Sequence, residues 1–192
     1  MLDALPAGQL SEIVGPRSSG SSSLLLAMVA RATASGRQVA FVDGADEFDP
    51  ASAVAAGADL SKLLWVKCGG RLRTAFSAAD LLARCPGFAF VALDLGELPL
   101  VCREPIPPAL CVRLGRAAEQ SDAILVLRAP HRVAGSAAAA AVSLRRRRSR
   151  WNGRPHPTRL AGLTSEARIL RSRAPRAGPR AEGEGIEIEW RL

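Results

Sequence analysis

Residues 15–22 of the chain, Gly-Pro-Arg-Ser-Ser-Gly-Ser-Ser, have the spacing of a phosphate-binding P-loop but lack its lysine. The P-loop pattern requires two glycines separated by four residues, followed by lysine and then by serine or threonine. Gly15, Gly20 and Ser22 fit this pattern, whereas Ser21 stands where the lysine belongs. The glycines let backbone N–H groups point at phosphate oxygens, and the lysine supplies a full positive charge. The sequence therefore predicts a nucleotide-binding architecture without a main part of its chemistry.

The flanking residues are of the kind that a P-loop requires, a buried strand before it and a helix after it. Residues 10–14 (LSEIV) predict a short strand, and the leucine- and alanine-rich residues 22–34 predict a helix that ends before Gly36. This context favours a degenerate P-loop over the alternative, which is an ordinary Gly/Ser turn between a strand and a helix.

Strand-like and helix-like segments alternate as far as residue 127. Apolar runs predict strands at residues 37–43, 63–66, 88–93 and 123–127, with helices between them at residues 51–56, 74–84 and 108–120. Near-continuous apolar strands that alternate with helices indicate an α/β fold, with a mainly parallel sheet covered by helices on both faces. The strand at residues 63–66 is expected to be buried. We expect residues 1–192 to form a single domain.

A different pattern follows residue 130. An alanine-rich segment that ends in four arginines predicts a helix at residues 136–150, and residues 151–153 predict a turn. Residues 159–171 and 185–191 predict strands, and the second alternates apolar and charged residues as a half-buried antiparallel strand does. We expect the sheet to end in this antiparallel pair, joined by a mobile loop at residues 172–184.

Composition narrows the class of protein further. Apolar residues make up 48% of the chain, and no apolar run is long enough to span a bilayer. The first residues lack the basic and apolar regions of a signal peptide, so we expect a cytoplasmic protein without membrane contact. The four cysteines form no CxxC pair, so the sequence predicts no metal site.

Positive charge is concentrated near the C-terminus. The net charge is +8, and residues 142–180 contain 12 arginines against one acidic residue, Glu166. Favourable charge at a helix C-terminus explains only part of this excess. Nucleic-acid contact is the favoured explanation, since it needs clustered cations and little else, and the alternatives are an acidic protein partner and a merely solvated face. The candidate nucleic-acid-binding residues are Arg145, Arg146, Arg147, Arg148, Arg150 and Arg154, with Trp151 as a residue that could stack on a base.

Three segments together resemble the core of the RecA recombinase family. Gly15 to Ser22 resembles the RecA P-loop, residues 41–50 (FVDGADEFDP) resemble the segment that carries RecA's catalytic glutamate, and Asp94 resembles the Walker-B aspartate. The resemblance covers residues 10–192 and implies a RecA-like P-loop core. Within that superfamily, the degenerate P-loop, the short chain and the HRVAGS…LRRRRSRW segment most resemble the ImuA type, RecA-like accessory proteins of bacterial damage-induced mutagenesis.

Matching the chain to the family pattern implies a degenerate nucleotide site. Its residues are Gly15, Arg17, Gly20, Ser21, Ser22, Asp49 and Asp94. Asp49 matches an adenine-contacting position, and Ser22 and Asp94 match a magnesium pair. Ala45 falls at the position of the glutamate that activates water, and the strand end near residues 127–130 lacks the glutamine that senses the γ-phosphate. We expect no catalytic residue and no cofactor, with Arg17 either a solvated loop residue or, as the alternative, a substitute cation.

These implications lead to a function hypothesis with two alternatives. The favoured hypothesis is a RecA-fold pseudo-ATPase that acts as an adaptor in SOS-induced translesion synthesis. Its implied partners are a catalytically inactive Y-family polymerase-like protein, an error-prone replicative-type polymerase and single-stranded DNA. The alternatives are a divergent DNA-dependent ATPase and a DNA-binding modulator of recombination without polymerase partners. We expect no RecA-like filament, because the nucleotide between RecA subunits would lack its main ligands here.

Overall fold

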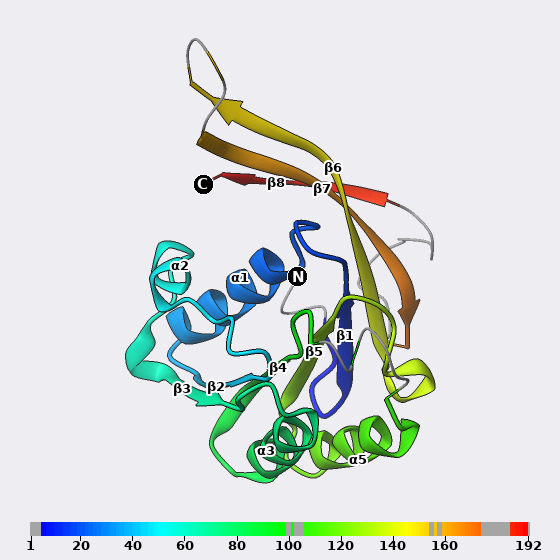
Figure 1. Cartoon of the computed structure of the whole chain (residues 1–192). Coiled ribbons are helices and arrows are strands. Elements are labelled where there is room, and N and C mark those ends of the chain that lie inside the picture. Colours follow the sequence, from blue (N-terminus) through cyan, green and yellow to red (C-terminus); the bar gives the residue numbers. More distant parts are fainter. Residues whose placement is uncertain are drawn as a thin grey trace.

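The computed structural model describes residues 5–98, 101, 106–153, 156, 159–173 and 185–191. Its strands form one eight-stranded sheet in the order β3-β2-β4-β5-β1-β6-β7-β8 (Figure 1). The first six strands in this order run parallel, and β7 and β8 are each antiparallel to the preceding strand. The strands span Leu10–Val14 (β1), Gln38–Asp43 (β2), Leu63–Lys67 (β3), Phe88–Asp94 (β4), Ile124–Ala129 (β5), Ala140–Asn152 (β6), Arg159–Ser172 (β7) and Gly185–Arg191 (β8). The predicted α/β fold and its C-terminal antiparallel pair are confirmed.

Helices cover both faces of the parallel part of the sheet (Figure 1). On one face lie α1 (Ser21–Ala34) and α2 (Pro50–Ala55), and on the other lie α3 (Leu72–Arg84) and α5 (Pro108–Glu119). Two 3₁₀ turns, η2 (Leu60–Lys62) and η3 (Gly135–Ala137), lie in connections. Each α-helix begins and ends within two residues of its predicted range. Among the described residues, no helix combines the length and apolar character needed to cross a membrane.

Two hydrophobic cores sandwich the sheet because successive strand residues point to opposite faces. On β2, Phe41 faces the α1 side and packs in one core with Leu25, whereas Val42 faces the α3 side and packs in the other core with Phe76. All four side chains are at least 97% buried. Each such side chain stabilises the fold by about 1.5–3 kcal/mol relative to an exposed position.

Residues 63–66 form a strand as predicted, but the prediction that this strand is buried is wrong. β3 lies at the edge of the sheet and pairs only with β2, so the side chains of Leu64 and Trp65 are 43% and 36% exposed. An apolar run predicts a strand but not its place in the sheet, since that place depends on which distant strands pair with it. The Trp65 ring still packs against Phe48, with 5.1 Å between ring centroids.

The helix predicted at residues 136–150 is also wrong, because this segment contains β6. The first residues of β6 pair with β1, from Ala140 opposite Ser11 to Ser143 opposite Val14, and its whole length pairs with β7. These backbone hydrogen bonds outweigh the helix propensity of alanine, which is only a weak local preference. Ala140 is buried by this pairing. The turn predicted at residues 151–153 is likewise wrong, because Trp151 and Asn152 continue the strand.

Beyond Ser143, where its pairing with β1 ends, β6 continues away from the parallel core together with β7 and β8 (Figure 1). We call this projecting part, residues 144–152, 159–168 and 185–191, the arm. The strands predicted at residues 159–171 and 185–191 are confirmed as β7 and β8. Of the loop predicted at residues 172–184, Ser172 is instead the last residue of β7, and residues 174–184 lie outside the described residues.

Candidate nucleotide site and arginine-rich arm

The predicted strand–loop–helix context of the P-loop is confirmed. Residues 15–20 connect the end of β1 to the start of α1, and Gly20 is the N-cap of α1 with a left-handed φ of 89°. A side chain at Gly15 would bring its Cβ to 2.3 Å from the Ser19 hydroxyl oxygen. Both glycines are therefore required by the path of the loop, as the motif predicts.

Ser21, in place of the lysine, is buried as the first residue of α1. Its hydroxyl donates to the Gly15 carbonyl oxygen at 3.4 Å, which closes the loop on itself. The same hydroxyl oxygen accepts a hydrogen bond from the Arg128 guanidinium at 3.3 Å. A positive charge therefore does lie beside the lysine position, but it comes from β5.

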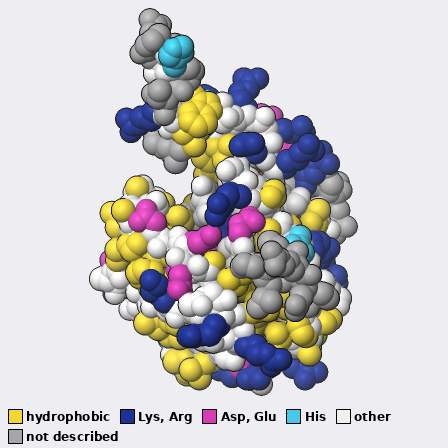
Figure 2. Space-filling model, in the orientation of Figure 1, with side chains coloured by type: hydrophobic (Ala, Val, Ile, Leu, Met, Phe, Trp, Pro, Cys, Tyr) yellow, Lys and Arg dark blue, Asp and Glu magenta, His cyan; other side chains and the backbone are white. Residues whose placement is uncertain are grey.

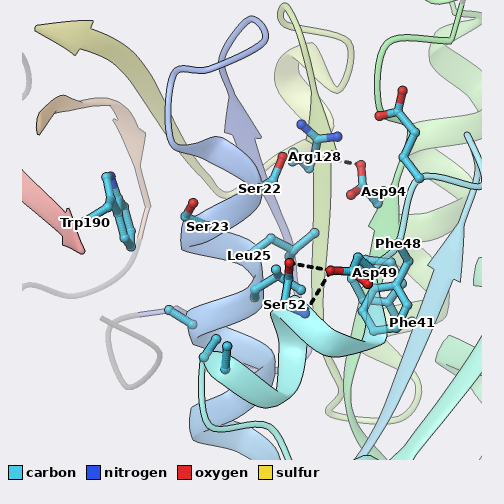
Figure 3. A pocket seen from close by; sticks show the side chains of 15 residues that line it. Ser22, Ser23, Leu25, Phe41, Phe48, Asp49, Ser52, Asp94, Arg128 and Trp190 are labelled. Atoms are coloured by element: carbon cyan, nitrogen blue, oxygen red, sulfur yellow. Dashed lines mark hydrogen bonds and ion pairs between the residues drawn. The ribbon is translucent and has the colours of Figure 1, made fainter. Parts of the chain in front are cut away.

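Arg128 forms its main contact with Asp94, the residue that resembles the Walker-B aspartate. The two residues lie directly opposite each other on the neighbouring strands β4 and β5. Arg128 Nε donates to Asp94 Oδ1 at 2.7 Å, and the Gly96 N–H donates to the same oxygen at 2.8 Å (Figure 3). The side chains are only 5% and 13% exposed. Burial raises the pKa of the Asp94 carboxyl, and the adjacent Arg128 charge opposes this shift.

Acidic side chains in the segment that resembles RecA's glutamate segment are also engaged. Asp43 accepts hydrogen bonds from the backbone N–H groups of Glu47 and Phe48, each at 3.0 Å, and from the Trp65 indole at 3.2 Å. Asp46 accepts the N–H groups of residues 68 and 69 at 3.1 and 3.0 Å. These hydrogen bonds fix the course of the segment.

Glu47 and Arg17 face each other across the mouth of the site. Arg17 Nη2 lies 3.2 Å from Glu47 Oε1, and the two side chains are 74% and 43% exposed. Arg17 is therefore neither an unpartnered loop residue nor directed at the P-loop backbone, and it makes an exposed ion pair. The sequence interpretation missed Glu47, whose only signal was its place in the acidic segment.

Asp49 lies at the far side of the site, where it caps α2. Its carboxylate accepts the N–H groups of Ala51 and Ser52 at 3.2 and 2.9 Å, and it also accepts the Ser52 hydroxyl. The hydrogen bonds from Ser52 hold the pKa of the Asp49 carboxyl below its ordinary value. The role of Asp49 in the described structure is thus that of a helix N-cap.

Glu47, Asp49, Asp94 and Arg128 line a cavity of about 700 Å³. Its walls come from α1, α2, the end of β4 and β5, with Trp190 of β8 on the opposite side of α1 from Phe48 and Asp49 (Figure 3). Ser22, at the predicted magnesium position, lines the cavity. Figure 2 shows the surface hollowed between the arm and the α1–α2 face.

ATP with magnesium is the cofactor that a P-loop fold implies, and these residues do not fit it. The lysine ammonium is absent, and Asp94 Oδ1 is bound to a guanidinium rather than available to a hydrated metal ion. Glu47 and Asp49 add two further carboxylates to the cavity wall. Phosphate groups would therefore meet acidic side chains with one buried, already paired cation.

The apex of the P-loop is attached to the arm. The Ser165 hydroxyl on β7 donates to the Ser19 carbonyl oxygen at 2.7 Å, and the Trp190 indole N–H on β8 donates to the Ser165 oxygen at 3.0 Å. A Cβ on Gly20 would lie 2.6 Å from both Ser165 Oγ and Trp190 Nε1. We call this chain of hydrogen bonds the clasp. Sequence reasoning missed it, since its residues are distant in the chain.

The arginine cluster lies on the arm in an extended strand, so its side chains do not point in all directions as a helix would require. Glu166, Thr164 and Gly162 alternate along β7 and share one face, and the β6 residues opposite them share that face too. A register shift between Arg146 and Arg148 leaves an extra residue, Arg147, whose guanidinium contacts Glu166 at 2.6 Å. The arginines of the predicted cluster on this outer face are Arg145, Arg147, Arg148 and Arg150, and Arg168 of β7 shares the face.

The remaining members of the predicted cluster lie elsewhere. Arg146 is opposite Ser165, on the face that carries the clasp. Trp151 is 53% exposed, and its indole N–H donates to the Ser149 hydroxyl at 3.2 Å. Arg154 lies outside the described residues. Figure 2 shows cationic side chains over the projecting part of the molecule that Figure 1 assigns to β6 and β7.

Glu166 is the acidic centre of this outer face. It binds Arg147 at 2.6 Å and Arg168 at 2.7 Å, and these contacts, Arg168 first, hold the pKa of its carboxyl below the ordinary value. Arg145, Arg148 and Arg150 are exposed. Arg145, Arg148 and Arg150 therefore remain beside a group of two arginines and one glutamate, which itself keeps a net positive charge.

Known proteins are similar to this chain in sequence and in fold. The chain is 39% identical over 90 residues to Protein RecA of Methylococcus capsulatus, 39% over 93 residues to that of Rhodospirillum rubrum, and 37% over 90 residues to that of Streptomyces venezuelae. These matches cover 47–48% of this chain but only 24–26% of the relatives. The chain thus spans about a quarter of the length of the curated relatives that it matches.

A solved structure supports the fold over nearly the whole chain. The crystal structure of the RadB recombinase superposes with a TM-score of 0.67 at 17% identity, and the alignment covers 95% of this chain and 87% of that one. In sequence, the RecA N-terminal domain family matches residues 2–101, which include the P-loop, the acidic segment and Asp94. The chain therefore belongs to the RecA family.

Proposed function

We propose that this protein is a non-hydrolysing RecA-fold adaptor in DNA-damage-induced translesion synthesis. The observation that carries the proposal is that each carboxylate of the site is already bound within the chain. Asp94 binds Arg128, Glu47 binds Arg17, and Asp43, Asp46 and Asp49 accept backbone N–H groups. No carboxylate of this set is left to position a metal ion or to activate water.

The magnitudes of these losses support the absence of turnover. A charge-assisted contact to phosphate contributes about 1.5–3 kcal/mol, so the missing lysine weakens nucleotide binding by roughly ten- to hundredfold. Loss of a general base removes a further factor of about 10²–10⁴ in rate. Without the P-loop lysine and the general base, hydrolysis of ATP at this site would be too slow to drive cycles of conformational change. A nucleotide-dependent filament is therefore not expected.

DNA contact is the second part of the proposal, and the arm is the surface that supports it. Arginines on one exposed face release counterions when they bind phosphates, and this binding does not depend on base sequence. Trp151 adds an exposed aromatic ring at the far end of β6. We propose single-stranded DNA as the ligand, since an extended strand can follow β6 and place a base on Trp151.

The adaptor role and its partners rest on the resemblance to the ImuA type. The partners would be a catalytically inactive Y-family polymerase-like protein and an error-prone replicative-type polymerase. An adaptor needs a stable scaffold rather than a nucleotide cycle. The clasp provides support for this role, because it fixes the P-loop to the arm and so joins the two parts of the scaffold.

A divergent DNA-dependent ATPase is the second candidate function, and Glu47 is the observation that favours it. Glu47 lines the cavity, and its exposed pair with Arg17 costs little to break. It is therefore the one carboxylate of the site that a small rearrangement would release. A plain DNA-binding modulator of recombination is the third candidate, and it would share the arm but lack the polymerase partners.

Affinity purification from DNA-damaged cells tests the adaptor role. We expect tagged wild-type protein to retain the two polymerase-type partners after nuclease treatment, because the contacts are between proteins. The variant R145A/R148A/R150A serves as the control for association through DNA, and it should retain the partners too. Partners that are lost from both proteins after nuclease treatment would support the recombination modulator instead.

A further inference from the structure

Arg128 lies where two separate positive charges of a working P-loop site would act. Its Nε is 2.7 Å from Asp94, the position that matches a magnesium partner, and its Nη1 is 3.3 Å from the Ser21 hydroxyl, the position that matches the lysine. One guanidinium therefore reaches from the metal side of the site to the lysine side. No other cation lines the cavity among the described residues.

The strand register places Arg128 beside Asp94. Residues 94 and 128 are direct neighbours on adjacent parallel strands, so the guanidinium needs no loop movement to reach the carboxylate. A buried guanidinium without an anionic partner is costly, and so is a buried carboxylate without a cation. Each side chain therefore holds the other in the site, and a metal ion at Asp94 would compete with Arg128 for the Oδ1 oxygen.

Ser21 fits Arg128 in size and in chemistry. Its hydroxyl is small and accepts a hydrogen bond from the guanidinium. A lysine at position 21 would instead place an ammonium group beside the guanidinium in a buried site, where two like charges repel strongly. Serine at 21 and arginine at 128 are thus compatible with each other, whereas lysine at 21 and arginine at 128 are not.

We propose that Arg128 is a built-in counterion of Asp94 that occupies the positions at which the P-loop lysine and the magnesium ion would act, and that it closes a latent nucleotide site. The glycine-dependent loop, Ser22 and the cavity beside α1 are retained. What excludes a magnesium nucleotide is the Arg128–Asp94 pair. This inference does not depend on the adaptor role, because it concerns the site and not the partners.

An exchange of two residues tests the proposal. Wild type, S21K, R128Q and S21K/R128Q are titrated calorimetrically with a non-hydrolysable ATP analogue and magnesium. We expect no saturable binding to wild type or S21K. S21K/R128Q should bind the analogue in a magnesium-dependent manner, with an affinity at least about tenfold above any residual affinity of wild type or S21K. The matched control is S21K/R17Q, which has the same net charge but keeps Arg128, and it should not bind.

Thermal denaturation gives a readout that does not depend on the nucleotide. S21K should lower the melting temperature because the introduced ammonium group and the Arg128 guanidinium repel each other, and R128Q in the same chain should restore part of the loss. Additive effects of the two substitutions would contradict the proposed charge exchange.

Three further outcomes would overturn the proposal. They are a folded S21K/R128Q protein that does not bind the analogue, binding by S21K alone that equals that of the double variant, and wild-type binding that R128Q abolishes. The last outcome would make Arg128 a phosphate ligand.

The wild-type protein supplies a test without any variant, because millimolar magnesium ATP should leave its melting temperature unchanged. A rise of several degrees would show that nucleotide binds with Arg128 in place.

Discussion

The Ser165 hydroxyl on β7 donates a hydrogen bond of 2.7 Å to the carbonyl oxygen of Ser19 at the apex of the P-loop. The two residues are 146 positions apart in the chain. This contact attaches the loop that would otherwise receive phosphate groups to the arginine-rich arm. The P-loop thus acts as a structural junction between the parallel core and the antiparallel strands.

Removal of the Ser165 hydroxyl should therefore weaken the fold. In S165A the Trp190 indole loses its acceptor and the Ser19 carbonyl loses its donor, and we expect a loss of about 1–3 kcal/mol in the free energy of unfolding. Urea denaturation measures this change. T164A is the matched control on the opposite face of β7 and should stay within about 0.5 kcal/mol of wild type. Equal losses in both variants would mean that the clasp has no specific role.

Glu12 should stabilise the connection that follows β5. This β1 residue is 1% exposed, and its carboxylate accepts the N–H groups of Val133 and Ala134 at 2.6 and 2.8 Å. In E12A these buried groups lose their acceptor, so we expect destabilisation of about 2–4 kcal/mol. Hydrogen exchange should accelerate most at the amides of Val133 and Ala134. A uniform increase over the whole chain would contradict a local role for Glu12.

Asp80 on α3 should make the stability dependent on pH. Burial alone would raise the pKa of its carboxyl, but the hydrogen bonds and charges of Arg113, at 2.7 Å, and Arg84, at 3.0 Å, outweigh this effect and hold the pKa below the ordinary value. A lowered carboxyl pKa contributes stability that is present above the unfolded-state pKa of about 3.9 and is lost as the pH falls through the folded-state pKa.

The variant D80N isolates this contribution. Wild type should exceed D80N in unfolding free energy at pH 7, by about 1–3 kcal/mol, and the difference should shrink as the pH falls below about 4. Denaturation curves at several pH values measure it. A difference that stays constant on acidification would mean that packing, rather than the charge of Asp80, makes the contribution.

The outer face of the arm should carry the electrostatic part of nucleic-acid binding. Arg145, Arg148 and Arg150 are exposed there, whereas Arg147 is paired with Glu166. Alanine at these three positions should make single-stranded DNA binding less dependent on salt. The slope of log K against log salt concentration should become shallower by about 0.7 for each phosphate that the protein no longer neutralises. Fluorescence anisotropy at several salt concentrations measures the slope.

The control for this experiment removes the same charge from the core. R71A/R73A/R116A takes three exposed arginines from or beside α3 and α5, and its salt dependence should equal that of wild type. If the arm variant binds like wild type, the arm serves a protein partner rather than nucleic acid. If the core variant loses as much affinity, binding reflects only the net charge.

Local patterns were sufficient to predict the parallel core. The P-loop glycines lie between a buried strand and a helix rich in leucine and alanine, and the strands at residues 37–43 and 88–93 are short apolar runs. The helix at residues 108–120 begins at Pro108, a residue that favours the first turn of a helix. These features depend on neighbouring residues, which a sequence displays directly.

The features that sequence reasoning missed depend on contacts between distant segments. Alanine at the start of β6 favours a helix locally, and only the pairing with β1 makes it a strand. Arg128 meets Asp94 because β4 and β5 are neighbours in a register that the sequence does not reveal. A signal was present nonetheless, since a charged residue near the end of the apolar run ILVLRA needs a buried partner.

The central claim is that each carboxylate of this RecA-family site is already bound within the chain, to an arginine or to backbone N–H groups, and that no group is left to support turnover. Phosphate release from magnesium ATP tests it most directly, measured with excess purified protein, with and without single-stranded DNA. We predict no release above the protein-free rate under either condition, and the same result for the variants E47Q and R17A. DNA-stimulated release by wild type that E47Q abolishes would contradict the account and establish the divergent ATPase.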